Sequence, residues 1–355
     1  MNYLLIFGAA FFAVILSVPF GQWLSVRFGI LAKPGGRRKH EGLIPKLGGL
    51  PLIFGLAVAW GLILWRFPIN AIEQKLVTGI MMGTVVIVLG GLLDDRYDLP
   101  PLFQTAVHLS ATLIAIRFDV FIEVFTTPAF LLPMWETAPF SALVDLQGAQ
   151  VWMIRPLAIA FTFFWILGMI NAVNWLDGLD GLASGVGLIA ALVFAWHSYS
   201  WQNFSIAAFP LALAAGLLGF LIFNFAPAKV YLGSAGAFLL GYQLATLSIV
   251  SPAKIMTALL VLALPILDVA WRIFDRARNG RNLFEGDRGH LHYLLVDNGL
   301  PVRPIVIGYY LCTIIFGIVV LWLPTPELKI SILIVLGTAV IVILRWLSTR
   351  QNQIA

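Results

Sequence analysis

Charged residues are scarce in this sequence: Asp, Glu, Lys and Arg make up 11% of its 355 residues, whereas hydrophobic residues make up 60%. A soluble globular protein carries about a quarter of its residues as charges, so a soluble enzyme is excluded. Disorder is excluded too, because disordered chains are poor in apolar residues. Cysteine is nearly absent, and the single Cys312 rules out a disulfide framework or a cysteine metal cluster. The composition indicates an integral membrane protein.

Apolar runs of about 20 residues, the length that crosses a bilayer, predict an all-α fold of about eleven transmembrane helices in one membrane domain, residues 1–355. The count is ten if one of the runs that Gly, Gln or His interrupts does not cross the membrane. The first span is expected to be a retained helix rather than a removed signal peptide. The predicted spans are 1–23, 48–66, 76–93, 102–118, 157–176, 182–198, 205–224, 235–250, 254–273, 305–323 and 330–347.

The distribution of Lys and Arg predicts an N-out, C-in orientation in the cytoplasmic membrane, because short loops rich in these residues stay in the cytoplasm. Segment 119–156 is then extracytoplasmic, with a composition that permits a small hairpin, and the basic loop 274–304 is cytoplasmic. In this orientation only six of the 22 Lys and Arg residues lie outside, namely Arg66, Lys75, Arg117, Arg155, Lys254 and Lys329.

Two adjacent acids, Asp94 and Asp95, end an apolar run on the predicted cytoplasmic side. Such a pair either holds Mg²⁺ together with a substrate phosphate or supplies a general base. When the pair is taken alone, a helix end with solvated acids is the favoured explanation. Within the span 254–273, Pro265 and Asp268 predict a kink or polar break that faces the protein interior.

Asn171, Asn174, Asp177 and Asp180 recur every third residue at the end of another span. A stripe with this period drifts around a helix, so the last members are expected in a break made by the neighbouring glycines. Amides suit recognition of a base or sugar, and carboxylates suit ribose hydroxyls or a cation. A polar helix cap at the membrane surface is the alternative.

His290 and His292 stand two residues apart in the basic loop and face the same way only if the segment is extended. Zinc needs three or four ligands, so contact with phosphate or sugar is favoured. Arg281 and Arg288 suit bidentate phosphate binding, although positive-inside bias also explains arginines here.

A short turn with Asn224 and the run Gly233-Ser234-Ala235-Gly236 precedes another span on the same side. Such a turn can approach a phosphate, but alone it is better explained by close helix packing. Taken together, the acids, amides and basic residues suit a nucleotide-activated substrate that meets a membrane-embedded phosphate.

Four motifs resemble, over nearly the whole chain, the polyprenyl-phosphate N-acetylhexosamine-1-phosphate transferases, especially the bacterial branch that loads N-acetylglucosamine-1-phosphate from its UDP form onto undecaprenyl phosphate. The resemblance implies release of UMP at the start of cell-envelope glycan synthesis, such as that of cell wall, lipopolysaccharide or teichoic acid. The motifs are His40-x-Gly42-Leu43-Ile44-Pro45-x-x-Gly48-Gly49, Asp94-Asp95-Arg96-Tyr97-Asp98-Leu99, Asn171-x-x-Asn174-x-x-Asp177-Gly178-x-Asp180-Gly181, and Gly280-Arg281 through Asp287-Arg288-x-His290-x-His292.

The resemblance also implies roles for single residues. Asp94 and Asp95 are the expected catalytic acids, and with Ser234 they are the expected Mg²⁺ ligands. The implied partners are a UDP-sugar donor, a polyprenyl phosphate acceptor and the bilayer, without nucleic acid, and a homodimer is left open. The expected substrate-binding residues are His40, Lys46, Asn174, Asp177, Asp180, Asn224, Arg281, Arg288, His290 and His292.

Three positions depart from the family pattern. Ser234 stands where the family has the Asp regarded as its principal metal ligand, Gln104 stands where a basic residue is usual, and Tyr293 replaces a further His. These departures keep open a catalytically silent relative. Muramoyl-pentapeptide phosphate transfer by the same fold also stays open. So does a lipid or solute transporter, although a transporter is expected to carry acids near mid-span.

Overall fold

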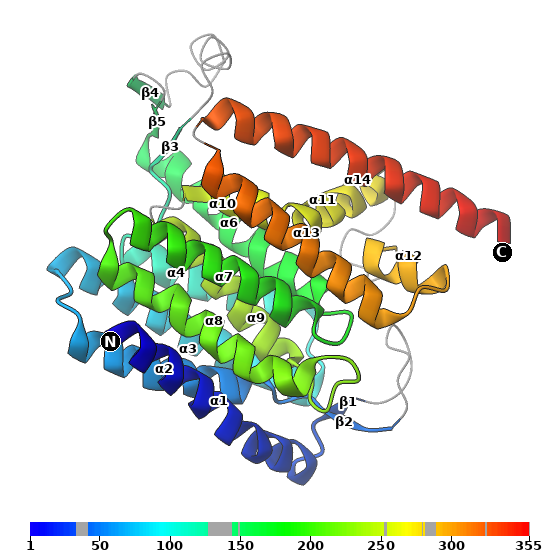
Figure 1. Cartoon of the computed structure of the whole chain (residues 1–355), viewed down its shortest axis with the longest axis horizontal. Coiled ribbons are helices and arrows are strands. Elements are labelled where there is room, and N and C mark those ends of the chain that lie inside the picture. The colour runs from blue at the N-terminus through cyan, green and yellow to red at the C-terminus, as the bar shows by residue number, and fades with distance from the viewer. Residues whose placement is uncertain are drawn as a thin grey trace.

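The computed structural model describes residues 1–32, 42–126, 144–147, 150–251, 254–278, 280, 289–323 and 325–354. Helices form nearly all of this part, with two small antiparallel sheets at their ends (Figure 1). The helices are α1 (Asn2–Arg27), α2 (Gly49–Arg66), α3 (Ala71–Tyr97), α4 (Pro101–Arg117), α6 (Arg155–Leu176), α7 (Leu182–Ser200), α8 (Phe204–Asn224), α9 (Gly233–Val250), α10 (Lys254–Val261), α11 (Ala263–Arg278), α12 (Leu291–Asp297), α13 (Val302–Trp322) and α14 (Pro326–Ile354). The strands are β1 (Leu31–Ala32), β2 (Ile44–Pro45), β3 (Val124–Thr126), β4 (Val144–Gln147) and β5 (Gln150–Met153).

The predicted all-helical membrane fold is confirmed, since helices occupy all of the predicted spans. Within the described ranges, eight helices are long and apolar enough to cross a membrane, or nine if α10 and α11 count as one broken span. The number eleven and the N-out, C-in orientation stay predictions.

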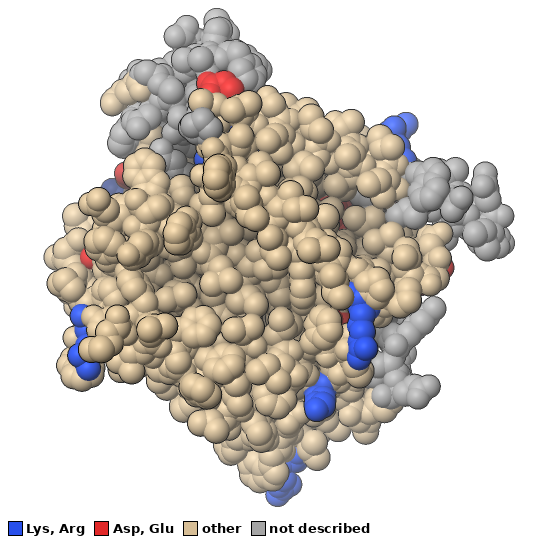
Figure 2. Space-filling model, viewed as in Figure 1, with Lys and Arg blue, Asp and Glu red and all other residues tan. Residues whose placement is uncertain are grey.

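The outer surface of the bundle suits lipid. Phe164, Leu16 and Trp322 are 80%, 76% and 85% exposed, and the face in Figure 2 is almost free of charge, with Lys and Arg mainly toward its margins. An exposed apolar surface of this extent would be costly in water. Helix α9, by contrast, is buried along nearly its whole length and packs against α3 and α6. Its first turn therefore lies in the middle of one end of the bundle.

The span predicted at 254–273 is broken rather than merely kinked. Helices α10 and α11 meet at an angle of 84° around Leu262. Pro265, the third residue of α11, has no N–H and its ring opposes the carbonyl four residues earlier, which favours a break at this point. Asp268 is 3% exposed and faces the interior, as predicted.

The small hairpin that the composition of 119–156 permits is present in the described residues, while its extracytoplasmic location stays a prediction. Strands β4 and β5 form an antiparallel hairpin, and β3 adds to β5 to give the order β3-β5-β4. The segment 274–304 is less of a loop than predicted, because α11 continues to Arg278 and α12 occupies Leu291–Asp297.

Successive long helices run in opposite directions, so alternate connections share an end of the bundle. We define the loop end as the end that carries β1, β2 and α12, on the right of Figure 1; the N-terminus and β3–β5 lie at the other end. The connections 98–100, 177–181 and 225–232 also belong to the loop end. Every motif that the sequence singles out, where it is described, lies there.

Candidate functional site

The connector between α8 and α9, residues 225–232, joins segments that are far apart in the sequence. The Tyr231 N–H donates to the Pro45 carbonyl (2.8 Å), and the Gly48 N–H donates to the Tyr231 carbonyl (3.0 Å). These two bonds attach the first motif to the start of α9. The sequence by itself indicates only a short turn here.

The third motif binds the same connector from the other side. Asp180 accepts a hydrogen bond from the Ala228 N–H (2.9 Å). Asn224 donates to the Val230 carbonyl (3.0 Å) and accepts from the Ser184 hydroxyl (2.6 Å). Asp180 and Asn224 were predicted to bind substrate, and the structure shows them holding the connector; a substrate role for either stays a prediction.

Two further bonds bring outlying helices to the connector. Arg303 at the start of α13 donates to the Ala226 carbonyl (2.9 Å), and Gln22 near the end of α1 donates to the Lys229 carbonyl (3.1 Å). The connector is therefore the point at which the first and third motifs, α1 and α13 meet, and it leads directly into the turn of α9 that contacts the second motif.

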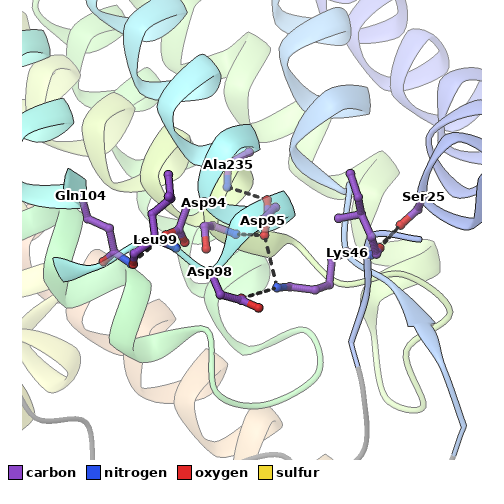
Figure 3. Close-up of polar contacts among 10 residues, drawn as sticks. Ser25, Lys46, Asp94, Asp95, Asp98, Leu99, Gln104 and Ala235 are labelled. Carbon is purple, nitrogen blue, oxygen red and sulfur yellow. Dashed lines mark hydrogen bonds and ion pairs between the residues drawn. The ribbon is translucent and has the colours of Figure 1, made fainter. Parts of the chain in front are cut away.

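The acid pair lies directly against the first turn of α9 (Figure 3). Asp95 has no exposed side-chain surface, and its two carboxylate oxygens accept from the backbone N–H groups of Ser234 (2.8 Å) and Ala235 (3.0 Å). A helix N-terminus has free N–H groups and a partial positive charge. The anion at the α9 N-terminus is therefore a side chain from α3.

Glycine at the start of α9 is required by this contact. Gly233 has φ of 71°, and a Cβ there would overlap the Lys46 carbonyl and the Asp95 carboxylate. The steric explanation favoured for the glycine-rich turn is thus confirmed. The Lys46 ammonium lies 3.8 Å from Asp95 Oδ1 and 3.6 Å from Asp98 Oδ1, which places one positive charge between the two carboxylates.

Asp94 points to a different set of donors. Its Oδ1 accepts from Gln104 Nε2 (2.9 Å) and from the Leu99 N–H (3.2 Å). Gln104 therefore contacts the acid pair from the position at which the family usually has a basic residue, but it brings no charge. Asp94 Oδ2 has no hydrogen bond within the described residues, so Asp94 is the member of the pair with an oxygen left for a ligand.

The predicted Mg²⁺ ligands do not fit a metal site in this arrangement. Both oxygens of Asp95 accept amide hydrogens beside an ammonium group, and Ser234 is attached to Asp95 through its backbone N–H. In the ranges that the structure describes, no three His, Cys, Asp or Glu side chains are placed to hold an ion. Of the three predicted ligands only Asp94 has a free carboxylate oxygen, so water and substrate phosphate would have to supply nearly all the other ligands of a Mg²⁺ ion.

The predicted break in the third motif is confirmed. Asn171 and Asn174 lie in the last turns of α6, Asp177 follows its final residue, and Gly181 precedes α7 with φ of 79°. Asn174 and Asp177 are both partly exposed. They are therefore accessible side chains at the loop end.

The histidines form a second polar cluster at the start of α12. His290 precedes α12 in an extended conformation, and its ring stacks on His292 with centroids 5.7 Å apart and planes within 11°. The prediction that the pair faces one way only in an extended segment is met at His290 alone, because His292 is already the second residue of α12. The ring of Trp175, at the end of α6, lies 5.7 Å from His290.

Asp268 holds this cluster from α11. Its Oδ2 lies 2.9 Å from His290 Nδ1, and its Oδ1 accepts from the Leu291 N–H (2.9 Å). We predicted Asp268 as an inward-facing polar residue but not as the partner of a motif histidine. The available signal was an acid inside an apolar span, which requires a polar partner.

The third and fourth motifs touch each other. A Cβ at Gly178 would overlap the His292 ring and the Tyr293 hydroxyl, so the glycine lets α12 approach the end of α6. Tyr293, which replaces a further histidine of the family pattern, is buried, and its ring centroid lies 4.2 Å from that of His292. The predicted residues His40, Arg281 and Arg288 lie outside the described residues.

Comparison with known proteins agrees with this gathering of motifs. Residues 77–252 match the family model described as glycosyl transferase family 4. A decaprenyl-phosphate N-acetylglucosaminephosphotransferase of Mycolicibacterium smegmatis is 30% identical over 322 residues, covering 81% of this chain and 74% of the relative. The chain belongs to glycosyl transferase family 4.

Further members of this family are similar over much of their length. A probable undecaprenyl-phosphate N-acetylglucosaminyl 1-phosphate transferase of Bacillus subtilis is 28% identical over 335 residues, 93% of this chain and 87% of the relative. An undecaprenyl-phosphate alpha-N-acetylglucosaminyl 1-phosphate transferase of Escherichia coli K12 is 26% identical over 294 residues, 80% of this chain and 74% of the relative. The family resemblance predicted from the four motifs is confirmed.

Proposed function

We propose that this protein transfers N-acetylglucosamine-1-phosphate from UDP-N-acetylglucosamine to a membrane polyprenyl phosphate and releases UMP. The observation that carries the proposal is that the described parts of all four motifs lie in one cluster at the loop end. The connector 225–232 binds the first and third motifs, and the first turn of α9 binds the second. The fourth motif packs against Gly178 of the third. The names of the relatives support the sugar phosphate and the class of acceptor. The UDP donor comes from the resemblance of the motifs.

In the proposed reaction, an oxygen of the lipid phosphate attacks the β-phosphorus of the donor. A new P–O bond forms to the lipid phosphate, the bond to the α-phosphate bridging oxygen breaks, and UMP leaves with that oxygen. Such a transfer requires positioning and charge stabilisation rather than covalent chemistry by the protein. Asp94, whose Oδ2 is not engaged, is the proposed acid near the lipid phosphate.

The accessible side chains near α12 are assigned to the donor. Asn174 and Asp177 are partly exposed at the end of α6, beside the segment that carries His290 and His292. Amides and carboxylates suit a base and ribose hydroxyls, and histidines suit a phosphate or sugar. Asp95 is assigned to positioning, because both of its oxygens hold α9.

The loop end is proposed to face the cytoplasm in the N-out, C-in orientation. Arg27, Lys46, Arg96, Lys229 and Arg303 lie at this end of their helices or in its connections, which is the distribution expected of a cytoplasmic face. A UDP-sugar made in the cytoplasm would reach the site from this side, and the acceptor phosphate would reach it from the bilayer.

Mg²⁺ is proposed only from the family resemblance. No step of the proposed reaction depends on it, because the described carboxylates do not form a metal site. Thermal unfolding of the purified protein with MgCl₂ and with EDTA is expected to give the same midpoint within about 1 °C, since a resident structural ion would raise it by mass action. The rate of UMP release in the same two buffers tests the Mg²⁺ requirement that the resemblance implies.

The proposed function is tested with purified protein in nanodiscs that contain undecaprenyl phosphate. UDP-N-acetylglucosamine should give UMP and a lipid-linked sugar pyrophosphate in equal amounts, and omission of the lipid should abolish both. A panel of UDP-hexosamines and UDP-muramoyl-pentapeptide identifies the donor. Failure to release UMP from any of them would instead favour a catalytically silent relative, which Ser234 and Gln104 keep open.

A further inference from the structure

Asp268 is a buried carboxylate that binds two different kinds of donor. It is 3% exposed, one oxygen accepts from the Leu291 N–H at the start of α12, and the other lies 2.9 Å from His290 Nδ1. The second oxygen is therefore available to control the imidazole rather than the helix.

A carboxylate beside one nitrogen of an imidazole fixes the proton on that nitrogen, because an ionised carboxylate only accepts hydrogen bonds. For His290 this means that Nδ1 carries the proton and Nε2 is the unprotonated nitrogen, which can accept a hydrogen bond. Within the described part of the chain Nε2 has no hydrogen bond, although the residue is 4% exposed. The neighbouring rings of Trp175 and His292 restrict the ring plane as well.

We propose that Asp268 is a positioning residue of the transferase site: it holds His290 as the Nδ1–H tautomer and so leaves Nε2 as the acceptor that meets a hydroxyl of the substrate's sugar. This inference rests on the proposed function for the identity of the substrate. Its structural part, the tautomer set by Asp268, does not depend on that function. Asp268 acts through His290 and is not itself expected to touch substrate.

Asp268→Asn separates this role from the capping of α12. The amide oxygen of Asn can still accept from the Leu291 N–H, which leaves its NH₂ facing Nδ1. Two donors cannot face each other, so the proton of His290 must move to Nε2. We expect kcat for UMP release to fall about 10- to 100-fold, by analogy with the loss of a carboxylate that orients a metal-binding histidine, while the melting temperature changes little. Asp268→Ala, which also removes the cap, should lower both.

A double-mutant cycle tests whether Asp268 works through His290. In the His290→Ala background, Asp268→Asn should have almost no further effect on kcat, because there is no imidazole left to orient. An equal loss in both backgrounds would overturn the proposal. A purely structural role would instead change the melting temperature in both backgrounds and leave kcat per folded molecule unchanged.

¹⁵N-histidine labelling gives a readout that needs no activity. The chain has five histidines, and the signals missing in His290→Ala identify this residue. The wild type should show a protonated Nδ1, and Asp268→Asn should show a protonated Nε2 with a bare Nδ1. A wild-type His290 protonated on Nε2 alone, or an unchanged tautomer in Asp268→Asn, would refute the proposal. Absence of UMP release with the expected tautomers would count against the proposed function and leave the role of Asp268 toward His290 standing.

Discussion

Two buried carboxylates at the loop end, Asp95 and Asp268, each meet the first turn of a helix that lies elsewhere in the sequence. Asp95 gives both oxygens to the backbone of α9. Asp268 gives one oxygen to the backbone of α12 and the other to His290. Both oxygens of the first carboxylate are occupied by backbone N–H groups, whereas the second carboxylate connects the backbone of α12 to the side chain of a motif histidine.

The difference teaches that an acid in a recognisable motif can be engaged entirely by backbone N–H groups, whereas an acid outside the motifs can contact a motif side chain. Asp95 belongs to the most recognisable motif, yet its surroundings are those of a helix cap with a nearby ammonium. Asp268 belongs to none of the four motifs, yet it orients a motif histidine. The contacts of the two oxygens, rather than membership of a motif, distinguish positioning of the backbone from positioning of a reactive group.

The largest expected effect on stability is that of Asp95→Ala. It leaves the partly buried N–H of Ser234 and the buried N–H of Ala235 without an acceptor, at about 1 to 3 kcal/mol each, so we expect a loss of roughly 3 kcal/mol, measured by thermal unfolding in detergent. Asp98→Asn is the control, because Asp98 is also near Lys46 but has a 91% exposed side chain, and Asn tolerates its left-handed backbone with φ of 46°. A wild-type melting temperature with no UMP release would instead make Asp95 catalytic.

A smaller effect is expected for Lys46→Met, which removes the only charge opposite Asp95 among the contacts described for that side chain. The buried carboxylate would lose an ammonium 3.8 Å away, and we expect a loss of about 1 kcal/mol because the lysine is partly solvated. The effect should shrink when Asp95 is already Asn. Equal effects of Lys46→Met in both backgrounds would show that the lysine stabilises the protein through Asp98 or the backbone instead.

Gln104 tests the other acid of the pair. Gln104→Leu removes one of the two hydrogen bonds to Asp94 Oδ1, for which we expect about 1 kcal/mol or less. Gln104→Lys places an ammonium near the same carboxylate and should keep the contact. The unfolding midpoints of the wild type, Gln104→Lys and Gln104→Leu should show the Leu variant as the least stable. A Leu variant as stable as the wild type would mean that the Gln104 contact contributes nothing to stability.

The smallest effect is expected at the opposite end of the bundle, where Asp119 pairs with Lys75 and lies 3.7 Å from Arg155. The hydrogen bond from Lys75 lowers the pKa of Asp119, so this pair stabilises the protein at neutral pH and is lost as the pH falls through that lowered pKa. Since the pair is exposed, Asp119→Asn should cost about 0.5 kcal/mol or less at pH 7. The unfolding midpoints of Asp119→Asn and the wild type should become equal at acid pH. A difference that widens on acidification would contradict the predicted direction of the pH dependence.

The sequence predicts the helices well, because apolar runs and helix breakers are local features. The apolar runs locate the helices, and the spacing of Asn174, Asp177 and the glycines locates the break after α6. The angle between α10 and α11 is predicted only in part, because Pro265 indicates a bend but not its size. The side of the membrane on which the motifs gather is predicted from Lys and Arg counts, and the structure brings the described motifs to one end.

The sequence does not predict which side chains these motifs bind. Asp95 and Ser234 are 139 residues apart, so nothing local indicates that one caps the helix of the other. The role of the connector 225–232 depends in the same way on long-range backbone bonds to Pro45 and Gly48. An acid in an apolar span does indicate a hidden partner, but only the packing of α11 against the start of α12 identifies it as His290.

The central claim, that Asp95 serves the fold and Asp268 serves the site, is tested most directly by the rate of UMP release per folded molecule in Asp95→Asn and Asp268→Asn measured side by side. We predict that Asp95→Asn loses folded protein but keeps most of its rate per folded molecule, whereas Asp268→Asn stays folded and loses about tenfold or more in rate. The reverse pattern would contradict the account.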